Sequence, residues 1–229
     1  GNYMFDNLNI DKNTPYKKIY KNKRIAIVGP APYLVGKGMG RTFDNYDFVI
    51  RFQKAHPVLP LRWKDYGKRT SALYHCMSQT SRNGGPISYA ELLKEDAWLV
   101  SAFPNVYPFN KDIAAMDKER PRPLKWHMPD EKLFYEVRSI LKSRPNTGFM
   151  SIIDLLGTDA SSIDIYGMTF FKGKPGEPQY IKEYRDISYS QLIKNTEKVT
   201  HRQGPQIFLF KKIVKYFNNI TIDNTLKKV

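Results

Sequence analysis

The fold of this chain is decided by residues 24–53, which read RIAIVGPAPYLVGKGMGRTFDNYDFVIRFQ. The first five residues are mostly apolar and β-branched, which is typical of a fully buried strand in a parallel sheet. The turn that follows contains residues that end both strands and helices. A glycine-rich segment leads to residues 46–51, which predict a second strand. Ligands of open α/β sheets bind beyond the carboxyl ends of the strands, so we place the active site beside Gly29, Pro30, Ala31 and Gln53.

The rest of the chain continues an alternation of strands and helices. Further strands are predicted at residues 71–76, 98–101, 162–167 and 220–222, and helices at 88–94, 131–142 and 206–217. We therefore expect an α/β fold, a Rossmann-like parallel sheet with helices on both faces. It forms a single domain over residues 24–229, with an excursion at 105–130 and a mobile loop at 171–178. Residues 1–23 are polar and lysine-rich, and we interpret them as a basic, loosely packed N-terminal arm.

The composition excludes some classes of protein but does not identify the function. The 229 residues are 41% hydrophobic, but no run of about 18 apolar residues is long enough to cross a membrane. The single cysteine, Cys76, excludes an intramolecular disulfide and favours a reducing, cytoplasmic compartment. The formal charge of +15 has two equally good interpretations. It can reflect a solvated lysine-rich surface, or it can attract a nucleotide-sugar, a membrane surface or nucleic acid.

A second informative stretch lies at residues 144–156. Asn146 and Thr147 stand where a nearly continuous apolar run begins, so they predict the start of a buried helix. Such a start presents backbone N–H groups and the positive end of the helix dipole, and Gly148 lets a phosphate approach the backbone. The strand at 162–167 ends with Gly167 at the same edge of the sheet. We therefore add these four residues to the predicted nucleotide site.

Together the two stretches resemble a known family. The first, continued by residues 67–70, resembles the large sialyl motif of the family 29 sialyltransferases, and residues 145–167 resemble its small sialyl motif. The matching residues of the first are Val28-Gly29, Leu34, Gly36, Gly38, Gly40, Asp44, Asp47 to Arg51, Gly67 and Arg69-Thr70. Those of the second are Pro145, Thr147-Gly148 and Asp164 to Gly167. The motifs stand in the family's order and cover about a third of the chain.

The resemblance implies an inverting glycosyltransferase that moves a sugar from a nucleotide donor, CMP-sialic acid by default, to a glycan or glycoconjugate hydroxyl. It implies a metal-independent enzyme without a cofactor, in which the small-motif helix start binds the nucleotide. The family's catalytic base is a histidine that lies where His201 stands in this sequence. By similarity to the family 42 enzymes, Tyr180 and Tyr184 would meet the leaving phosphate. Histidine suits the role of catalytic base because its pKa lies near neutrality.

Three residues depart from the family pattern. Pro30 and Gln53 stand where the family has asparagines that contact the donor nucleotide, so a UDP- or GDP-linked sugar is the alternative donor. The final motif closes with Gln206 in place of glutamate. The other histidines lack a motif, and His75 is interpreted as a core residue. Arg51 is expected to bind phosphate, to brace loops or to pair with Asp44 or Asp47.

Other function classes fit less well. An NAD-dependent oxidoreductase needs Gly-x-Gly-x-x-Gly after the first strand and an acid at the end of the second, but here Pro30 and Arg51 stand there. A basic nucleic-acid-binding protein is the non-enzymatic alternative, yet no binding motif of that class is present. The expected partners are thus a nucleotide-sugar and a glycan or glycoconjugate acceptor, without nucleic acid. The basic surface leaves a peripheral membrane contact open.

Overall fold

The computed structural model describes residues 5, 8, 10, 12–81, 83–104, 124–169 and 203–228. Within these residues, the strands form one seven-stranded sheet in the order β5-β4-β3-β2-β1-β6-β7, and all recorded pairs are parallel. The strands are β1 (Arg24–Val28), β2 (Phe48–Phe52), β3 (Ala72–His75), β4 (Trp98–Ser101), β5 (Trp126–His127), β6 (Ser162–Tyr166) and β7 (Ile220–Ile222). The strand order reverses at β1, which pairs with β2 on one side and with β6 on the other. The predicted α/β, Rossmann-like sheet is confirmed.

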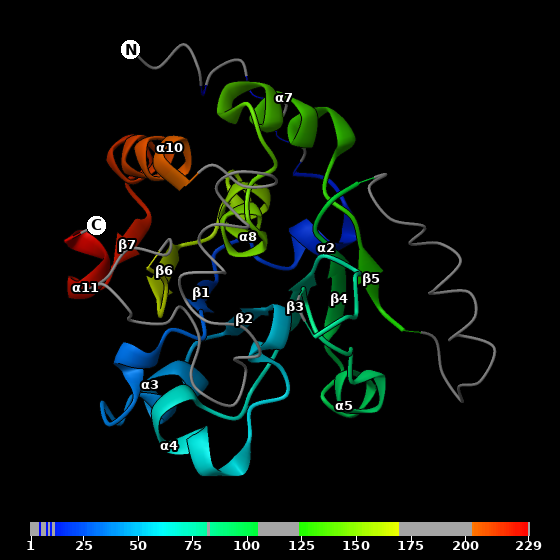
Figure 1. The fold of residues 1–229 in the computed structure, drawn as a ribbon, viewed down its shortest axis with the longest axis vertical. Helices are drawn as coiled ribbons and strands as arrows, with labels where there is room; N and C mark the ends of the chain where they lie inside the picture. The colour runs from blue at the N-terminus through cyan, green and yellow to red at the C-terminus, as the bar shows by residue number, and fades with distance from the viewer. Residues whose placement is uncertain are drawn as a thin grey trace.

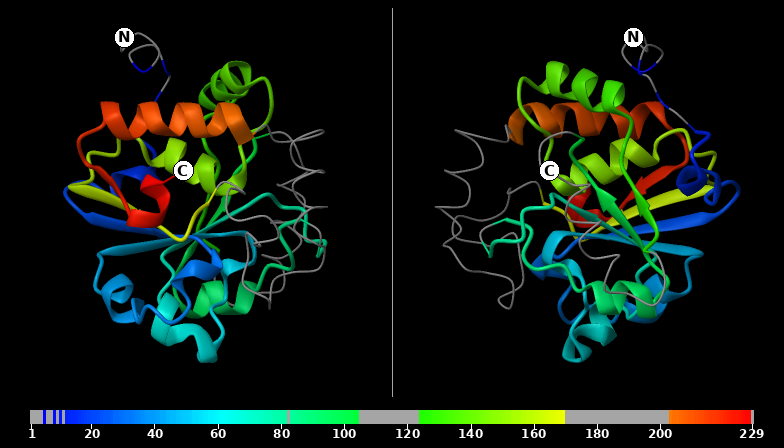
Figure 2. Two further views of the ribbon diagram at one scale, coloured as in Figure 1. Left: turned by 60° about the vertical axis from the view of Figure 1, so that its left-hand side comes forward. Right: turned by 90° about the vertical axis from the view of Figure 1, so that its right-hand side faces the viewer.

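Helices cover both faces of the sheet (Figures 1 and 2). One layer contains α7 (Glu131–Leu141), α8 (Thr147–Leu155) and α10 (Gln203–Tyr216). The other layer contains α3 (Gly40–Asp44), α4 (Trp63–Tyr66) and α5 (Tyr89–Lys94). Shorter elements are α2 (Pro15–Lys18), α11 (Asn224–Lys227) and the 3-10 helices η1 (Pro32–Leu34), η2 (Gln53–Ala55) and η3 (Pro60–Arg62).

Strand β1 shows how this sandwich is built. Successive side chains of a strand point to opposite faces. Ile25 and Ile27 accordingly join the core beneath α8, whereas Ala26 and Val28 join the core beneath α3 and α4. All four are buried. A strand covered on both faces needs apolar residues at every position, which is why this run contains no polar alternation.

The described part of the expected N-terminal arm is packed into the domain. Tyr16 in α2 and Tyr20 just after it are almost fully buried. Lys17 is 1% exposed, and its ammonium lies 3.3 Å from the carboxylate of Asp154 in α8, so its charge is paired. Two aromatic rings and a buried ion pair therefore anchor residues 16–20, whereas most other residues of 12–23 are exposed or half-buried. The division into an arm and a domain at residue 23 stays a prediction.

The predicted strands and longer helices agree closely with those observed, and the strand predicted at 220–222 is the edge strand β7. The sequence did not predict β5, which lies inside the expected excursion, nor the short helices α2, α3, α4, α11, η1, η2 and η3. Residues 105–123 and the expected mobile loop at 171–178 lie outside the described residues. Within the described part of the chain, no helix is both long and apolar enough to span a membrane.

Candidate active site

The turns after β1 and β6 are joined at the carboxyl edge of the sheet. The Gly29 N–H donates to the Tyr166 carbonyl at 2.8 Å, and the Ala31 N–H donates to the Gly167 carbonyl at 3.0 Å. A Cβ atom on Gly29 would lie 2.3 Å from the Gly167 oxygen, and one on Gly167 would lie 2.3 Å from the Gly29 oxygen. Because Gly167 also has φ +73°, the two turns approach this closely only with glycine at both positions.

The start of α8 reaches the same place through the ring of Phe52. A Cβ on Gly29 would lie 2.9 Å from this ring, and a Cβ on Gly148 would lie 2.7 Å from it. Phe52 thus contacts the backbone of both predicted nucleotide-binding segments. The two distant stretches singled out in the sequence therefore meet at one edge of the sheet, around the last residue of β2.

The first turn of α8 contains backbone N–H groups that the helix does not use, in residues that are buried. The Asn146 side chain caps the helix by accepting from the Phe149 N–H at 2.7 Å, and the Met150 N–H makes the first helical bond, to the Asn146 carbonyl. The N–H groups of Thr147 and Gly148 precede that bond, so the helix itself does not use them. No acidic residue lies in this turn, and the positive end of the helix dipole is therefore not neutralised there.

Gln206 in α10 holds this helix start in place. Its side chain is fully buried, and its Oε1 accepts from the Asn146 N–H at 2.7 Å. This contact joins the segment that follows His201 in the sequence to the segment that would bind the nucleotide. In the sequence, Gln206 is visible only as a departure from a motif. Phe52 was not predicted as a site residue, and its one signal in the sequence is its position at the end of a strand.

Two of the residues predicted to bind the nucleotide, Gln53 and Ala31, make hydrogen bonds within the protein. Gln53 has left-handed backbone geometry, with φ 54°, and its Oε1 accepts from the Cys76 N–H at 3.0 Å. Its side chain is thus turned toward the end of β3. The Ala31 carbonyl accepts from the Tyr66 hydroxyl at 2.5 Å, and Pro30 and Ala31 are buried. These residues fix the shape of the edge through their backbone.

Arg51 braces a turn. Its side chain is fully buried, and its Nη2 donates to the carbonyls of Tyr66 and Arg69, both at 2.8 Å. Asp44 accepts from the N–H groups of Lys68 and Arg69 at 3.0 Å, so it fastens the same turn from the other side. Of the roles considered for Arg51, the structure supports loop bracing. Asp44 acts as a turn-fixing residue.

The three described histidines all bind other protein groups. His56 Nε2 lies 2.7 Å from the Glu95 carboxylate, and His127 Nε2 lies 3.1 Å from that of Asp154. His75 Nδ1 accepts from the Met77 N–H at 2.8 Å, which leaves Nε2 to donate to the Gly85 carbonyl at 3.0 Å. His75 is fully buried, and burial lowers its pKa to about 4, so it is a neutral core residue as expected.

The remaining predicted site residues, His201, Tyr180 and Tyr184, lie outside the described residues. Their roles stay predictions. The expectation of a metal-independent site also stays a prediction, although the described part of the chain contains no group of three or more His, Cys, Asp or Glu side chains placed to hold a metal ion.

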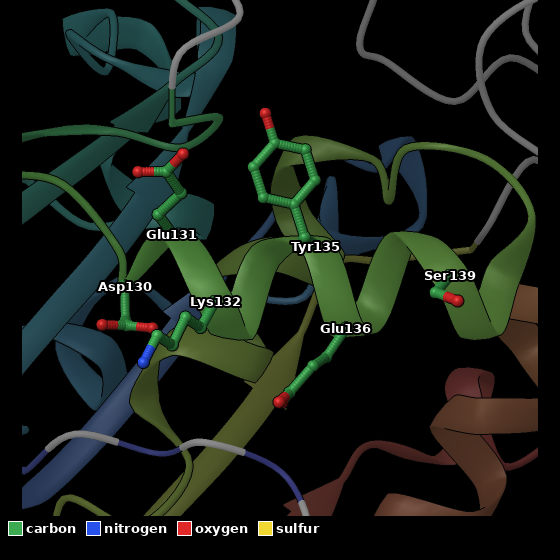
Figure 3. Close-up of a pocket in the computed structure, with 6 residues that line it drawn as sticks. All are labelled: Asp130, Glu131, Lys132, Tyr135, Glu136 and Ser139. Carbon is green, nitrogen blue, oxygen red and sulfur yellow. The ribbon is translucent and has the colours of Figure 1, made fainter.

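A surface pocket of about 790 Å³ lies on α7 and is separate from this edge. Figure 3 shows its side chains, with Glu131 and Tyr135 extending to one side of the helix and Lys132 and Glu136 to the other. Asp130 and Ser139 complete the lining. Three carboxylates and one lysine make this surface repel a phosphate. It contains none of the predicted nucleotide-binding residues.

Comparisons with known proteins agree with this architecture. No protein-family model matches the chain, and no curated protein sequence matches it either. A mammalian sialyltransferase structure matches with a TM-score of 0.58 at 17% identity, covering 96% of this chain and 76% of that one. The sialyltransferase CstII from Campylobacter jejuni, in complex with the substrate analogue CMP-3FNeuAc, matches with a TM-score of 0.52 at 13% identity, covering 89% and 88%. The chain thus has the fold of the sialyltransferases, as its two motifs predicted.

Proposed function

We propose that this protein is a glycosyltransferase that takes its sugar from a nucleotide-linked donor and transfers it to a glycan or glycoconjugate hydroxyl. One observation carries the proposal: Gly29 and Gly148, from two distant motifs, pack on the same Phe52 ring at the carboxyl edge of the sheet. This is the edge where open α/β sheets bind their ligands. The amides of Thr147 and Gly148, which make no bond within the helix, then suit a nucleotide phosphate.

A CMP-linked sugar acid is the donor we favour. The motif resemblance points to it, and the matching CstII structures were solved with CMP-3FNeuAc and with cytidine 5′-monophosphate. The alternative, a UDP- or GDP-linked sugar, is motivated by Pro30 and Gln53. The carbonyl oxygen of the Gln53 side chain is bonded to the Cys76 N–H. Gln53 therefore uses this oxygen within the fold, and this observation motivates the alternative donor.

The proposed reaction is a direct displacement. The acceptor oxygen forms a bond to the anomeric carbon while the bond from that carbon to the phosphate oxygen breaks, with inversion. The acceptor proton passes to His201, and the phosphate leaves with the bonding electrons. Its charge is met by Tyr180 and Tyr184 and by the start of α8. The occupation of His56, His75 and His127 by protein partners supports His201 as the base.

Thermal unfolding in the presence of CMP, UDP, GDP and TMP tests the donor class, because a ligand that binds the native state raises its melting temperature. We expect CMP to give the largest increase. A larger increase with UDP or GDP would change the donor but keep the proposal. If none of the four nucleotides stabilises the protein and it binds RNA with steep salt dependence, the non-enzymatic alternative is correct.

The variant His201→Ala tests the mechanism. We expect it to abolish sugar transfer while CMP affinity, measured by calorimetry, stays within a few-fold of the wild-type value. His56→Ala is the matched control, because His56 is also a histidine of this chain but is bonded to Glu95. Near-normal turnover of His201→Ala would exclude this residue as the base.

A further inference from the structure

Helix α10 presents a basic stripe with one exposed aromatic ring. Phe208, Lys211, Lys212 and Lys215 are all exposed. Lys211 and Lys212 lie three and four residues after Phe208, and Lys215 lies four and three residues after them, which places all four on one face of the helix. The Phe208 side chain is 63% exposed. Lys212 Nζ lies 4.8 Å from the centre of its ring, so the charge and the aromatic surface are contiguous. We call these four residues the α10 stripe.

Helix α10 packs on the rest of the protein through its opposite face. Ile207, Leu209, Phe210 and Ile213 are buried in the main core, and Gln206 is bonded to Asn146. Figure 2 shows α10 on the outside of its helix layer, on the far side of α8 from the other layer. The fold therefore does not require an aromatic ring or three lysines on the outward face. A large exposed ring at this position loses the free energy that burial would give it.

The charge along α10 has one sign. Residues 203–216 contain no aspartate or glutamate, and Lys227 and Lys228 of the following segment are also exposed. The only acidic residue between 203 and 228 is Asp223. Its carboxylate caps α11 and accepts from the Tyr33 hydroxyl at 2.5 Å, so it is already engaged in the fold. The outward face of α10 thus complements an anionic surface.

We propose that the α10 stripe docks the protein on an anionic phospholipid surface. Lysines attract acidic headgroups, and a phenylalanine beside them inserts at the boundary between headgroups and acyl chains. The stripe lies on a convex helix face and contains lysines without arginine. Single-stranded nucleic acids instead bind in grooves, and planar arginine side chains are favoured for specific nucleic-acid contacts. The geometry therefore favours a lipid surface over an RNA.

Docking on this face would fix the position of the candidate active site. Helix α10 starts next to the start of α8, because Gln206 accepts from the Asn146 N–H. A membrane bound along α10 would therefore lie beside the carboxyl edge of the sheet. The docking proposal depends only on the outward face of α10 and is independent of the proposed transfer reaction.

Co-sedimentation with vesicles tests the proposal, using phosphatidylcholine alone and phosphatidylcholine mixed with phosphatidylglycerol. We expect binding only to the mixed vesicles, weaker at high salt. Each lysine near an anionic surface gives about a fivefold gain in affinity, so the triple variant Lys211→Ala/Lys212→Ala/Lys215→Ala should bind roughly a hundredfold more weakly. Phe208→Ser should weaken binding roughly tenfold, and this loss should persist at high salt.

The matched control is Lys21→Ala/Lys64→Ala/Lys94→Ala. These lysines are exposed on other elements, and the variant has the same net charge as the α10 variant. We expect its vesicle binding to stay within about threefold of wild type. Circular dichroism and the CMP-induced melting shift should be unchanged in both triple variants, which separates this proposal from the proposed transfer activity.

Three results would overturn the docking proposal. The first is a wild-type protein that does not bind phosphatidylglycerol vesicles at low salt. The second is equal weakening by the two triple variants, which would assign the binding to net charge rather than to α10. The third is an RNA affinity that depends on the α10 stripe while vesicle binding does not, which would make nucleic acid the partner of this face.

Discussion

Phe52 fills the space that two glycines leave at the carboxyl edge of the sheet. Its ring is in contact with the backbone at Gly29 and at Gly148. These glycines belong to the two motifs recognised in the sequence, so the motifs share a physical requirement. A Cβ atom on Gly29 would meet the Gly167 carbonyl as well as the Phe52 ring, whereas a Cβ atom on Gly148 would meet the ring. The role of Gly148 in phosphate approach is a proposal, whereas its packing on Phe52 is visible in the structure.

This packing predicts the effects of alanine substitutions. Gly148→Ala places a Cβ within 3 Å of the Phe52 ring and should lower the free energy of unfolding by about 1–3 kcal/mol, the usual cost of overpacking. Gly204→Ala in α10 is the control, because nothing lies within 4 Å of its Cβ position, and it should be neutral or stabilise by up to about 1 kcal/mol. Urea denaturation measures both.

A double variant identifies the cause of that loss. Phe52→Leu shortens the ring side chain, so Gly148→Ala/Phe52→Leu should be less destabilised than the sum of the two single variants. Additive effects would mean that the clash with Phe52 is not what makes glycine necessary at position 148.

His75 shows why a histidine at the edge of a site need not be catalytic. Both of its ring nitrogens are bonded to the backbone of the segment after β3, and the ring is fully buried. Burial lowers its pKa to about 4, whereas an unfolded histidine titrates near 6.5. Between these values the unfolded chain binds a proton that the native protein does not, so the native state loses stability as the pH falls from 6.5 to 4.

The expected loss from His75 is about 2 kcal/mol between pH 7 and pH 4.5. Urea denaturation of the wild type and of His75→Asn at the two pH values isolates it, since asparagine keeps a hydrogen-bond acceptor and does not titrate. The stability difference between the two proteins should shrink by that amount at the lower pH. A difference that is independent of pH would show that the pKa of His75 is the same in the native and unfolded states.

At the scale of elements, sequence reasoning succeeded where a periodic pattern had clear ends. Residues 24–28 and 98–101 were predicted as strands with the observed bounds. Asp130 stands directly before the predicted helix and caps α7 by accepting from the Leu133 N–H at 3.0 Å. Ser88 begins α5, but its side chain makes no capping bond. Strand β5 has only two residues and follows a proline-rich stretch, so no alternation was long enough to reveal it.

The sequence could not predict contacts made by tertiary approach. Gln206 and Asn146 are 60 residues apart, and nothing local to either residue indicates their hydrogen bond. Likewise, nothing in the sequence distinguishes Phe52 from other strand residues, because its contacts with Gly29 and Gly148 form only in the folded protein. The carboxyl edge as the location of the site was predictable from the strand order of such folds, but its internal packing was not.

The two helix caps of this layer give a matched pair of variants. Asn146→Ala and Asp130→Ala each remove a side chain that accepts from the third N–H of a helix, so each should cost about 1 kcal/mol of stability. Only Asn146 lies at the predicted nucleotide site. We therefore expect weaker CMP binding for Asn146→Ala and unchanged CMP binding for Asp130→Ala, measured by calorimetry. Equal affinities in both variants would remove the start of α8 from the nucleotide site.

At the scale of the whole molecule, a buried charge cluster joins parts of the chain that are distant in sequence. The Asp154 carboxylate in α8 lies 3.3 Å from the Lys17 ammonium, accepts from the Tyr74 hydroxyl at 2.6 Å and lies 3.1 Å from His127 Nε2. It thereby connects the N-terminal segment with β3 and β5. Lysine 17 belongs to a stretch that reads as a solvated basic arm, because a sequence does not show which of several lysines finds a carboxylate.

Burial raises the pKa of the Asp154 carboxyl, but attraction to Lys17, with smaller contributions from His127 and Tyr74, outweighs it and lowers the pKa to about 2. An unfolded aspartate titrates near 3.9. The ionised pair therefore stabilises the native state above about pH 4, and this contribution is lost as the pH falls through 4 toward 2. The cluster makes the anchoring of residues 12–23 sensitive to acid.

Removing one partner of this pair should cost more than removing the charge of both. Lys17→Met leaves a buried carboxylate without its counter-ion, so we expect it to lower the free energy of unfolding by about 3–5 kcal/mol at neutral pH. Lys17→Met/Asp154→Asn carries no buried charge, and its amide oxygen still accepts from Tyr74, so most of that loss should be recovered. Urea denaturation of both variants measures the difference. If the double variant were less stable than Lys17→Met, the carboxylate would be held by Tyr74 and His127, and the N-terminal segment would be anchored by its tyrosines alone.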